Sequence, residues 1–192
     1  MLDPTLNDRL RGIRLLAMDV DGVLTNGGIQ LGILASGESL ELKAFNVKDG
    51  LGLSLARSSG IEVAWITGRI SQVVERRAAE LGVREVCQWA RNKRQALTEM
   101  EQRLGIERSH VLYIGDDLND LPAFEAAGVT VAVADAVTTV RERADWVTDA
   151  PGGAGAVREV VEAVLHAQGR WDAAVQAFLE RLEGEHGRPP AQ

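Results

Sequence analysis

Short apolar runs alternate along the chain with longer stretches in which apolar residues recur every three or four positions. Five of the runs have the length of a strand, and helical spacing follows most of them. They lie at residues 13–18, 61–66, 111–114, 129–133 and 146–147. Because strands separated by helices pair in parallel and need cover on both faces, the pattern predicts an α/β fold, a Rossmann-like three-layer sandwich with a central parallel sheet.

Helical spacing fills the stretches between these runs. Val74, Ala78 and Leu81 are four and three residues apart, as on one face of a helix, and a last long helix is expected at about 155–168. We expect one main domain over residues 1–170. Residues 171–192 then form a C-terminal amphipathic helix that ends in a polar, flexible tail.

Residues 27–45 break the alternation of strands and helices. Two runs of alternating polarity flank Ser36-Gly37, a turn signal, which predicts a projecting β-hairpin. A lone hairpin with an apolar side is marginal in water. We therefore favour pairing with the same hairpin of other subunits over the alternative, in which the hairpin folds back onto its own domain.

Composition limits the classes of partner. The chain has 192 residues, 45% of them hydrophobic, which suffices for one buried core, and a net charge of −7 argues against a nucleic-acid surface. An anionic small substrate would need a local basic pocket. The single Cys87 fits a reducing cytoplasm or a small buried residue. Without an apolar run long enough for a signal peptide or a membrane span, we expect a cytoplasmic protein that binds no membrane.

Polar residues stand directly after three of the strand-like runs. Asp19 and Asp21 follow the first, Thr67 the second, and Asp116 the third, after Gly115. Ligands of open parallel sheets bind beyond the carboxyl ends of the strands, so these side chains are expected to converge. An Asp-x-Asp pair alone is a weak signal, but in order with a Thr, a Lys and a second acidic cluster it indicates phosphoryl transfer through a phosphorylated aspartate.

Each residue type suits one requirement of that chemistry. Asp19 and Asp116 offer oxygen ligands to Mg²⁺, which offsets the repulsion between a carboxylate and a phosphate. Asp19 attacks phosphorus, and Asp21 protonates the leaving alkoxide and later takes a proton from water. Thr67 binds a phosphoryl oxygen, and Lys93 brings a positive charge to the nucleophile and the transferred group.

Asp117 and Asp120 have two interpretations. They could act from a second shell, orienting Lys93 or the metal site, or they could cap the helix that begins there. The same residues also permit a phosphoacceptor signalling module with a long-lived phosphoaspartate. Asp21 separates the two functions, because a proton shuttle beside the nucleophile makes the phosphoenzyme short-lived.

These motifs identify a resemblance to the haloacid dehalogenase superfamily, whose four signatures match Asp19-x-Asp21, Thr67, Lys93 and Gly115-Asp116-Asp117. More narrowly, the chain resembles the capless 3-deoxy-D-manno-octulosonate 8-phosphate phosphatases of lipopolysaccharide biosynthesis. Further matching stretches are 19–25, 42–50, 66–69, 131–135, 144–145 and 152–159.

The resemblance implies a core without a cap domain and a homotetramer whose hairpins form a central barrel, with each active site completed by a neighbouring subunit. It implies Mg²⁺ held by the side chains of Asp19 and Asp116 and by the backbone carbonyl of Asp21. It also implies hydrolysis of a small phosphorylated sugar acid, namely 3-deoxy-D-manno-octulosonate 8-phosphate or a related 2-keto sugar acid phosphate; the alternative is another small phosphometabolite. The implied substrate contacts are Asn46, Val47, Lys48, Asp49, Gly50, Thr67, Gly68, Arg69, Arg77 and Lys93.

Basic residues and departures from the family pattern bear on the substrate. Lys48, Arg69 and Arg77 would supply the basic pocket that a sugar acid phosphate needs, although Arg77 could equally face solvent. Ser54 stands where the family usually has an Arg, and Trp89 interrupts a stretch that is Gly-rich in the family. We expect the reaction to be kept and the choice of sugar to depend on these positions.

Overall fold

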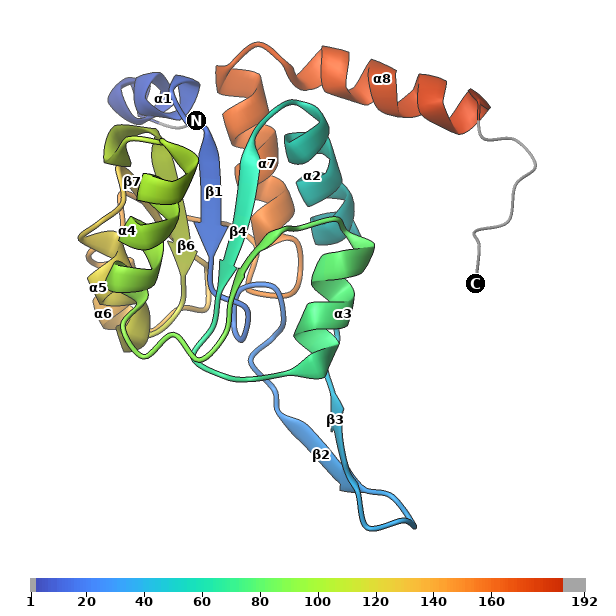
Figure 1. Ribbon diagram of the computed structural model, residues 1–192. Coiled ribbons are helices and arrows are strands. Elements are labelled where there is room, and N and C mark those ends of the chain that lie inside the picture. Colours follow the sequence, from blue (N-terminus) through green and yellow to red (C-terminus); the bar gives the residue numbers. More distant parts are fainter. Residues whose placement is uncertain (1–2, 185–192) are drawn as a thin grey trace.

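The computed structural model describes residues 3–184. Its centre is a six-stranded sheet in the order β5-β4-β1-β6-β7-β8, with all neighbours parallel (Figure 1). The strands are β1 (Leu15–Met18), β4 (Glu62–Ile66), β5 (Glu85–Cys87), β6 (Val111–Gly115), β7 (Val129–Ala132) and β8 (Trp146–Val147). The predicted parallel α/β sandwich is confirmed, and β5 is an addition that the apolar pattern did not reveal.

Helices cover both faces of the sheet. In Figure 1, α4 lies in front of the sheet and α7 behind it, with α2 and α1 beside α7. The helices are α1 (Pro4–Arg11), α2 (Val47–Ser58), α3 (Gln72–Glu80), α4 (Lys93–Leu104), α5 (Leu121–Phe124), α6 (Thr138–Arg141), α7 (Ala156–Ala167) and α8 (Trp171–Gly184), with short 3₁₀ turns η1 (Arg108–His110) and η2 (Leu118–Asp120). Because both faces are covered, β1, β6 and β7 are buried along their whole length.

The order of the strands decides where a ligand can bind. β1 is central, between β4 and β6, so the chain leaves it for one side of the sheet and later crosses to the other side. The loops that follow these three strands therefore diverge, leaving a crevice at their carboxyl ends. Asp19, Thr67 and Asp116 follow β1, β4 and β6, so the strand order alone brings their backbones together.

The hairpin consists of β2 (Gln30–Ile33) and β3 (Ser39–Leu42), paired antiparallel. It turns at Gly37, whose φ of +86° lies in the left-handed region. The hairpin projects beyond the carboxyl ends of the strands instead of folding back onto the domain (Figure 1). Leu31 and Ile33 on it are 71% and 81% exposed.

The C-terminal segment forms α8, which starts at Trp171 against α7 and extends away from the sheet (Figure 1). The predicted helix is therefore present over Trp171–Gly184, and the predicted tail lies outside the described residues. Among residues 3–184, no helix combines the length and the apolar character needed to cross a membrane.

Candidate active site

The loops after β1 and β6 are in close contact at Gly22. The Asp19 N–H donates to the carbonyl of Ile114, which continues the β1–β6 ladder to the first carboxylate. Directly after Asp21, the loop turns at Gly22 with a φ of +102°. A Cβ at Gly22 would lie 2.0 Å from Oδ2 of Asp116, so only glycine leaves room for that carboxylate beside the Asp-x-Asp loop.

Lys93 forms ion pairs with Asp19, which follows β1, and with Asp120, in the segment that follows β6. It is the first residue of α4, whose N-terminus is capped by the side chain of Asn92. Its Nζ lies 2.9 Å from Oδ2 of Asp19 and 2.7 Å from Oδ1 of Asp120, and the residue is only 2% exposed. A buried lysine needs such partners, because an unpaired ammonium would be strongly destabilising away from water.

Both carboxylate oxygens of Asp120 accept hydrogen bonds from other groups of the protein. Oδ1 accepts hydrogen bonds from Lys93 and from the hydroxyl of Tyr113, at 2.7 and 2.8 Å. Oδ2 accepts the backbone N–H groups of Asp116 and Asp117, at 2.9 and 3.2 Å. Asp120 therefore fixes both the ammonium of Lys93 and the loop that carries Asp116, while also completing the capping box of η2.

The other two carboxyl groups near Lys93, those of Asp19 and Asp116, have raised pKa values. Burial, and then the charge of Asp120, raise the pKa of Asp19 to about 7 and that of Asp116 to about 8. For Lys93, burial lowers the pKa, but Asp120 and Asp19 together outweigh it and the net shift is upward. One ammonium thus faces three carboxylates, which leaves the cluster short of positive charge.

A divalent cation fits this cluster. Asp19, Asp116 and Asp120 each offer a carboxylate oxygen within 4.8 Å of the other two. Since Asp120 is fully engaged, the available oxygens belong to Asp19 and Asp116, and Oδ1 of Asp116 is buried with no hydrogen-bond partner. Hard oxygen donors in a cluster with excess negative charge suit Mg²⁺.

The raised pKa values of Asp19 and Asp116 predict that Mg²⁺ stabilises the protein more at high pH than at low pH. Folding raises the pKa of Asp19 and Asp116 from about 3.9 in an unfolded chain, so without metal their contribution to stability is greatest below about pH 4 and is lost as pH rises through about 7 and 8. Binding Mg²⁺ at low pH must displace these protons. Thermal melts with and without Mg²⁺ should show a larger rise in Tm at about pH 8.5 than at about pH 5.5.

The matched control is Asp116→Asn, which removes a charged ligand from the cluster but nearly keeps its shape. We expect the variant to lose most of the Mg²⁺-dependent rise in Tm at the higher pH. Equal rises at both pH values in the unaltered protein would contradict the assignment of these carboxylates as ligands.

Thr67 sits at the end of β4 with its hydroxyl proton available. The residue is buried, its N–H donates to the carbonyl of Cys87, and its Oγ1 accepts the N–H of Arg69 at 3.2 Å. The hydroxyl can therefore still donate to a phosphoryl oxygen. Gly68, between them, keeps the loop free of a side chain.

The proton-transfer candidate Asp21 has a partner that sequence reasoning missed. Lys43, just after β3, forms an ion pair with Oδ1 of Asp21 and a second one, at 3.5 Å, with Glu41. Oδ2 of Asp21 is buried without a hydrogen-bond partner. The signal was present in the sequence as charges on alternate residues of the hairpin strand.

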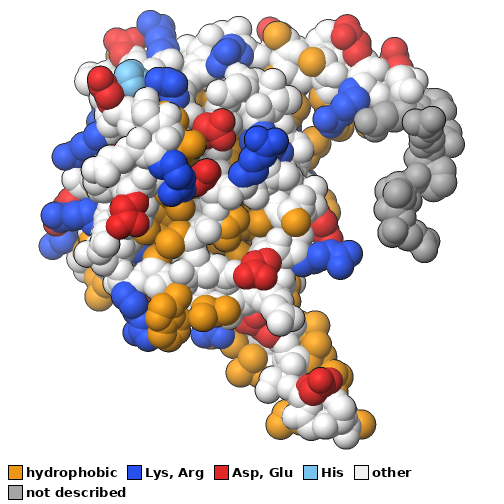
Figure 2. Space-filling view, viewed as in Figure 1, with side chains coloured by type: hydrophobic (Ala, Val, Ile, Leu, Met, Phe, Trp, Pro, Cys, Tyr) orange, Lys and Arg blue, Asp and Glu red, His pale blue; other side chains and the backbone are white. Residues whose placement is uncertain are grey.

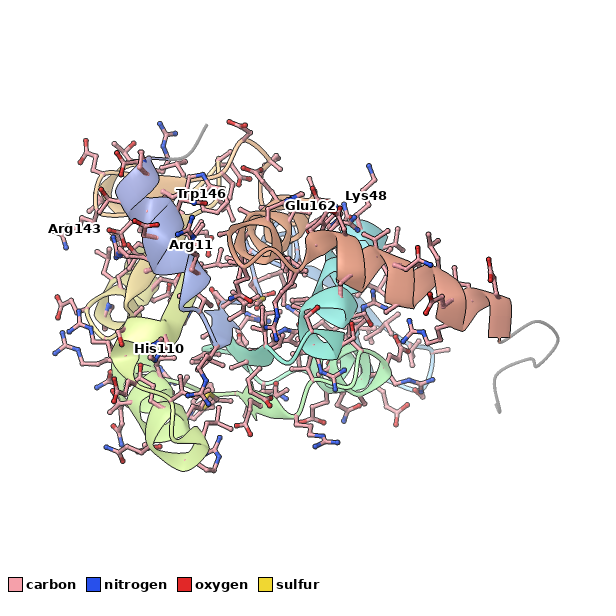
Figure 3. All side chains as sticks on the ribbon, turned by 90° about the horizontal axis from the view of Figure 1, so that it is seen from above. Arg11, Lys48, His110, Arg143, Trp146 and Glu162 are labelled. Carbon is pink, nitrogen blue, oxygen red and sulfur yellow. The ribbon has the colours of Figure 1, made fainter. Side chains whose placement is uncertain are left out.

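The residues around the start of α2 divide into three groups. Asn46 caps the helix through Oδ1, and Val47 and Lys48 are exposed; Lys48 extends outward from the ribbon in Figure 3. Asp49 is buried, and its two oxygens accept the N–H groups of Gly155 and Arg158 at the start of α7. Asp49 therefore fixes α2 against α7, and its predicted contact with a substrate stays a prediction.

Arg77 and Gly50 are neighbours. A Cβ at Gly50 would lie 2.6 Å from Nη2 of Arg77, so this glycine admits the guanidinium, which lies over the ring of Phe45 at 5.9 Å. The side chain of Arg77 is only 23% exposed. The alternative interpretation, in which Arg77 faces solvent, therefore does not describe its position. It pairs with Glu80 at 3.3 Å.

Trp89 lies on the loop between β5 and α4. Its φ of +57° is the only positive value outside glycine among the described residues. Its N–H donates to the carbonyl of Arg69, and its 55%-exposed ring lies 3.9 Å from the guanidinium of Arg91. This places an aromatic surface beside the loop of Thr67.

The structure thus brings Asp19, Lys93, Asp116 and Asp120 into one cluster and places Asp21 and Arg69 next to it, with Oδ2 of Asp21 3.9 Å from Nε of Arg69. Asp117 lies at the edge, where its Oδ1 accepts the N–H of Leu118 at 2.7 Å. Asp117 is therefore engaged as a cap.

Comparison with known proteins gives consistent matches. Residues 64–160 match the family model described as haloacid dehalogenase-like hydrolase. The 3-deoxy-D-manno-octulosonate 8-phosphate phosphatase KdsC of Salmonella typhimurium is 48% identical over 90% of each chain. The crystal structure of the phosphatase of that name from Moraxella catarrhalis, in complex with magnesium, phosphate and KDO, has a TM-score of 0.84 at 45% identity and covers 91% of this chain and 98% of that one. The cobalt-bound enzyme of Haemophilus influenzae has a TM-score of 0.81 at 40% identity, covering 89% and 99%.

Proposed function

The chain belongs to the haloacid dehalogenase-like hydrolases and is a Mg²⁺-using phosphoric monoester hydrolase of that family, and we propose that its substrate is 3-deoxy-D-manno-octulosonate 8-phosphate. The observation that carries the phosphatase chemistry is the cluster of Asp19, Asp116 and Lys93 at the carboxyl ends of β1 and β6. The proposal is supported by relatives of that name that align over nearly the whole chain.

The first step transfers the phosphoryl group to the protein. An oxygen of Asp19 attacks phosphorus, the bond between phosphorus and the sugar oxygen breaks, and Asp21 gives its proton to that oxygen. Asp19 and Asp116 would hold Mg²⁺, which supplies positive charge against the repulsion between carboxylate and phosphate. Lys93 and the Thr67 hydroxyl stabilise the charge on the phosphoryl oxygens.

The second step restores Asp19. Asp21, now ionised, takes a proton from a water molecule whose oxygen attacks phosphorus, and the acyl-phosphate bond breaks to release inorganic phosphate. Oδ2 of Asp21 accepts no hydrogen bond and lies 3.9 Å from Nε of Arg69, so it is the oxygen available for both proton transfers. A group of this kind beside the phosphoaspartate suits turnover and disfavours a signalling module, whose phosphoaspartate must survive.

We propose that the substrate contacts are those implied by the resemblance, namely Asn46, Val47, Lys48, Asp49, Gly50, Thr67, Gly68, Arg69, Arg77 and Lys93. Arg69 is 42% exposed beside Asp21, close to where the ester would lie, and is suited to bind the sugar carboxylate. Lys48 points outward in this single chain (Figure 3), and we propose that it contacts the substrate bound by a neighbouring subunit.

A panel of phosphate esters tests the substrate. Phosphate release is measured with and without Mg²⁺ for octulosonate, nonulosonate and simple sugar phosphates, ranked by kcat/KM. We expect activity only with the metal, and the octulosonate ester to rank first. A nonulosonate ester or a plain sugar phosphate in first place would overturn the named substrate while leaving the phosphatase assignment intact.

We further propose a cytoplasmic homotetramer that assembles through the hairpin. Figure 2 shows apolar side chains along the projecting arm. They include Ile29, Leu31, Ile33, Leu34, Leu40 and Leu42, all exposed in the single chain. An apolar, unpaired β-ribbon of this kind is covered most simply by copies of itself.

Charging the hairpin should therefore dissociate the assembly. In light scattering we expect the unaltered protein to be a tetramer and a Leu31→Glu/Ile33→Glu variant to be smaller, because two carboxylates would be buried at the interface. Glu38→Gln, at the polar tip, serves as the control and should leave the mass unchanged. A monomeric unaltered protein would contradict hairpin assembly.

A further inference from the structure

The two faces of strand β3 have opposite characters. Leu40 and Leu42 point to one face, where they are 38% and 53% exposed. Glu41 and the following Lys43 point to the other, where their side chains are 18% and 1% exposed. This alternation follows the period of a strand. Leu31 of β2 pairs with Glu41 and so shares this second face, on which only the base of the hairpin, at Glu41 and Lys43, meets the loop of Asp21.

A lysine so deeply covered next to an exposed ribbon needs a reason. Lysine is rarely buried unless it is paired. The ammonium of Lys43 pairs with Oδ1 of Asp21 and with Oε1 of Glu41. It thereby connects the base of the hairpin to the catalytic loop, which is 22 residues away in sequence.

Glu41 is itself fixed. Its Oε2 accepts the Ser71 hydroxyl at 2.5 Å, and its Oε1 lies 3.5 Å from Arg69. Burial raises the pKa of Glu41, but the bonds from Ser71 and Lys43 outweigh it and the net shift is downward. An ionised Glu41, held from the loop after β4, therefore gives Lys43 a second carboxylate partner besides Asp21.

The consequence for Asp21 is a defined orientation. With Oδ1 held by Lys43, rotation of the carboxylate is restricted, and Oδ2 is left without a hydrogen-bond partner. We propose that Lys43, anchored by Glu41, is a positioning residue that orients Asp21 so that Oδ2 faces the oxygen of the ester. The inference rests on the proposed role of Asp21 as the proton donor, and it makes the hairpin base part of the catalytic apparatus.

The test uses the dependence of rate on the leaving group. The sugar phosphate leaves as an alkoxide and needs a proton, whereas p-nitrophenyl phosphate leaves as a stable phenolate and does not. In Lys43→Met, kcat/KM for the sugar phosphate should fall on the order of 10²-fold, and that for p-nitrophenyl phosphate less than about tenfold. Lys43→Arg should recover part of the loss, because it keeps a donor toward Asp21.

A double-mutant cycle shows whether the effect passes through Asp21. Adding Lys43→Met to Asp21→Asn should change kcat/KM for the sugar phosphate by less than about twofold. The control is Arg76→Met on α3, which removes an exposed cation, 83% exposed, and should behave as wild type with both esters.

Equal losses for the two esters, or a full Lys43→Met effect in the Asp21→Asn background, would overturn the proposal. Equal losses in Lys43→Arg and Lys43→Met, with a lowered Tm in both, would also count against it and indicate a structural role. If the wild-type protein hydrolyses p-nitrophenyl phosphate but not the octulosonate ester, only the substrate proposal fails, and the best alkyl phosphate of the panel takes its place in the test.

Discussion

Asp19→Asn is expected to lower kcat on the order of 10⁴-fold or more while leaving the protein folded. The amide has nearly the shape of the carboxylate, but it is a poor nucleophile and brings no charge to a cation. Since burial disfavours the charged form of Asp19, the neutral amide should fit its site without loss of stability in the absence of metal. Phosphate release measures the rate, and circular dichroism measures the fold.

The control for this variant is Asp8→Asn, which changes an exposed carboxylate on α1. It should retain wild-type kcat and Tm. Full activity in Asp19→Asn, or in the corresponding Asp19→Ala, would refute the proposed nucleophile.

Lys93→Met is expected to reduce both stability and activity. The substitution leaves Asp19 and Asp120 without their shared ammonium in a site that is nearly inaccessible to water. Breaking a buried ion pair in this way costs about 3–5 kcal/mol of unfolding free energy. Loss of the charge near the phosphoryl group should lower kcat on the order of 10²- to 10³-fold. Urea unfolding without Mg²⁺ and phosphate release with it measure the two effects.

A double variant separates these effects. Lys93→Met/Asp120→Asn removes one of the stranded charges, so it should regain part of the lost stability but not the activity. Arg94→Met, which removes the exposed neighbouring cation on the same helix, should stay within about 0.5 kcal/mol of wild type. Wild-type stability in Lys93→Met, or restored activity in the double variant, would contradict the described role.

The sequence predicted the sheet well because its strands are buried on both faces and therefore form continuous apolar runs. Asp19, Thr67 and Asp116 follow directly on such runs, so their convergence required only the strand order. β5 was missed because its three residues, Glu85–Cys87, are only half-buried and too short to give a period. α1 was missed because only Leu6 and Leu10 mark its buried face.

The contacts between acidic and basic residues were harder to predict, because they depend on tertiary distances. Asp120 could be a cap or a partner of Lys93; it is both, since its two oxygens face different donors. Asp49 matches a family motif near the site, yet it holds the N-terminus of a helix 106 residues further on. The alternation around Lys43 was visible in the sequence, but only the orientation of the hairpin decides which face meets Asp21.

The most direct test of the account is a crystal structure of the protein with Mg²⁺ and beryllium trifluoride, which mimics a phosphoryl group on a carboxylate. We expect beryllium bonded to an oxygen of Asp19, Mg²⁺ contacted by Asp19 and Asp116, and Lys93 still bound to Asp120. Beryllium bonded to another carboxylate, or Mg²⁺ bound away from Asp116, would contradict it.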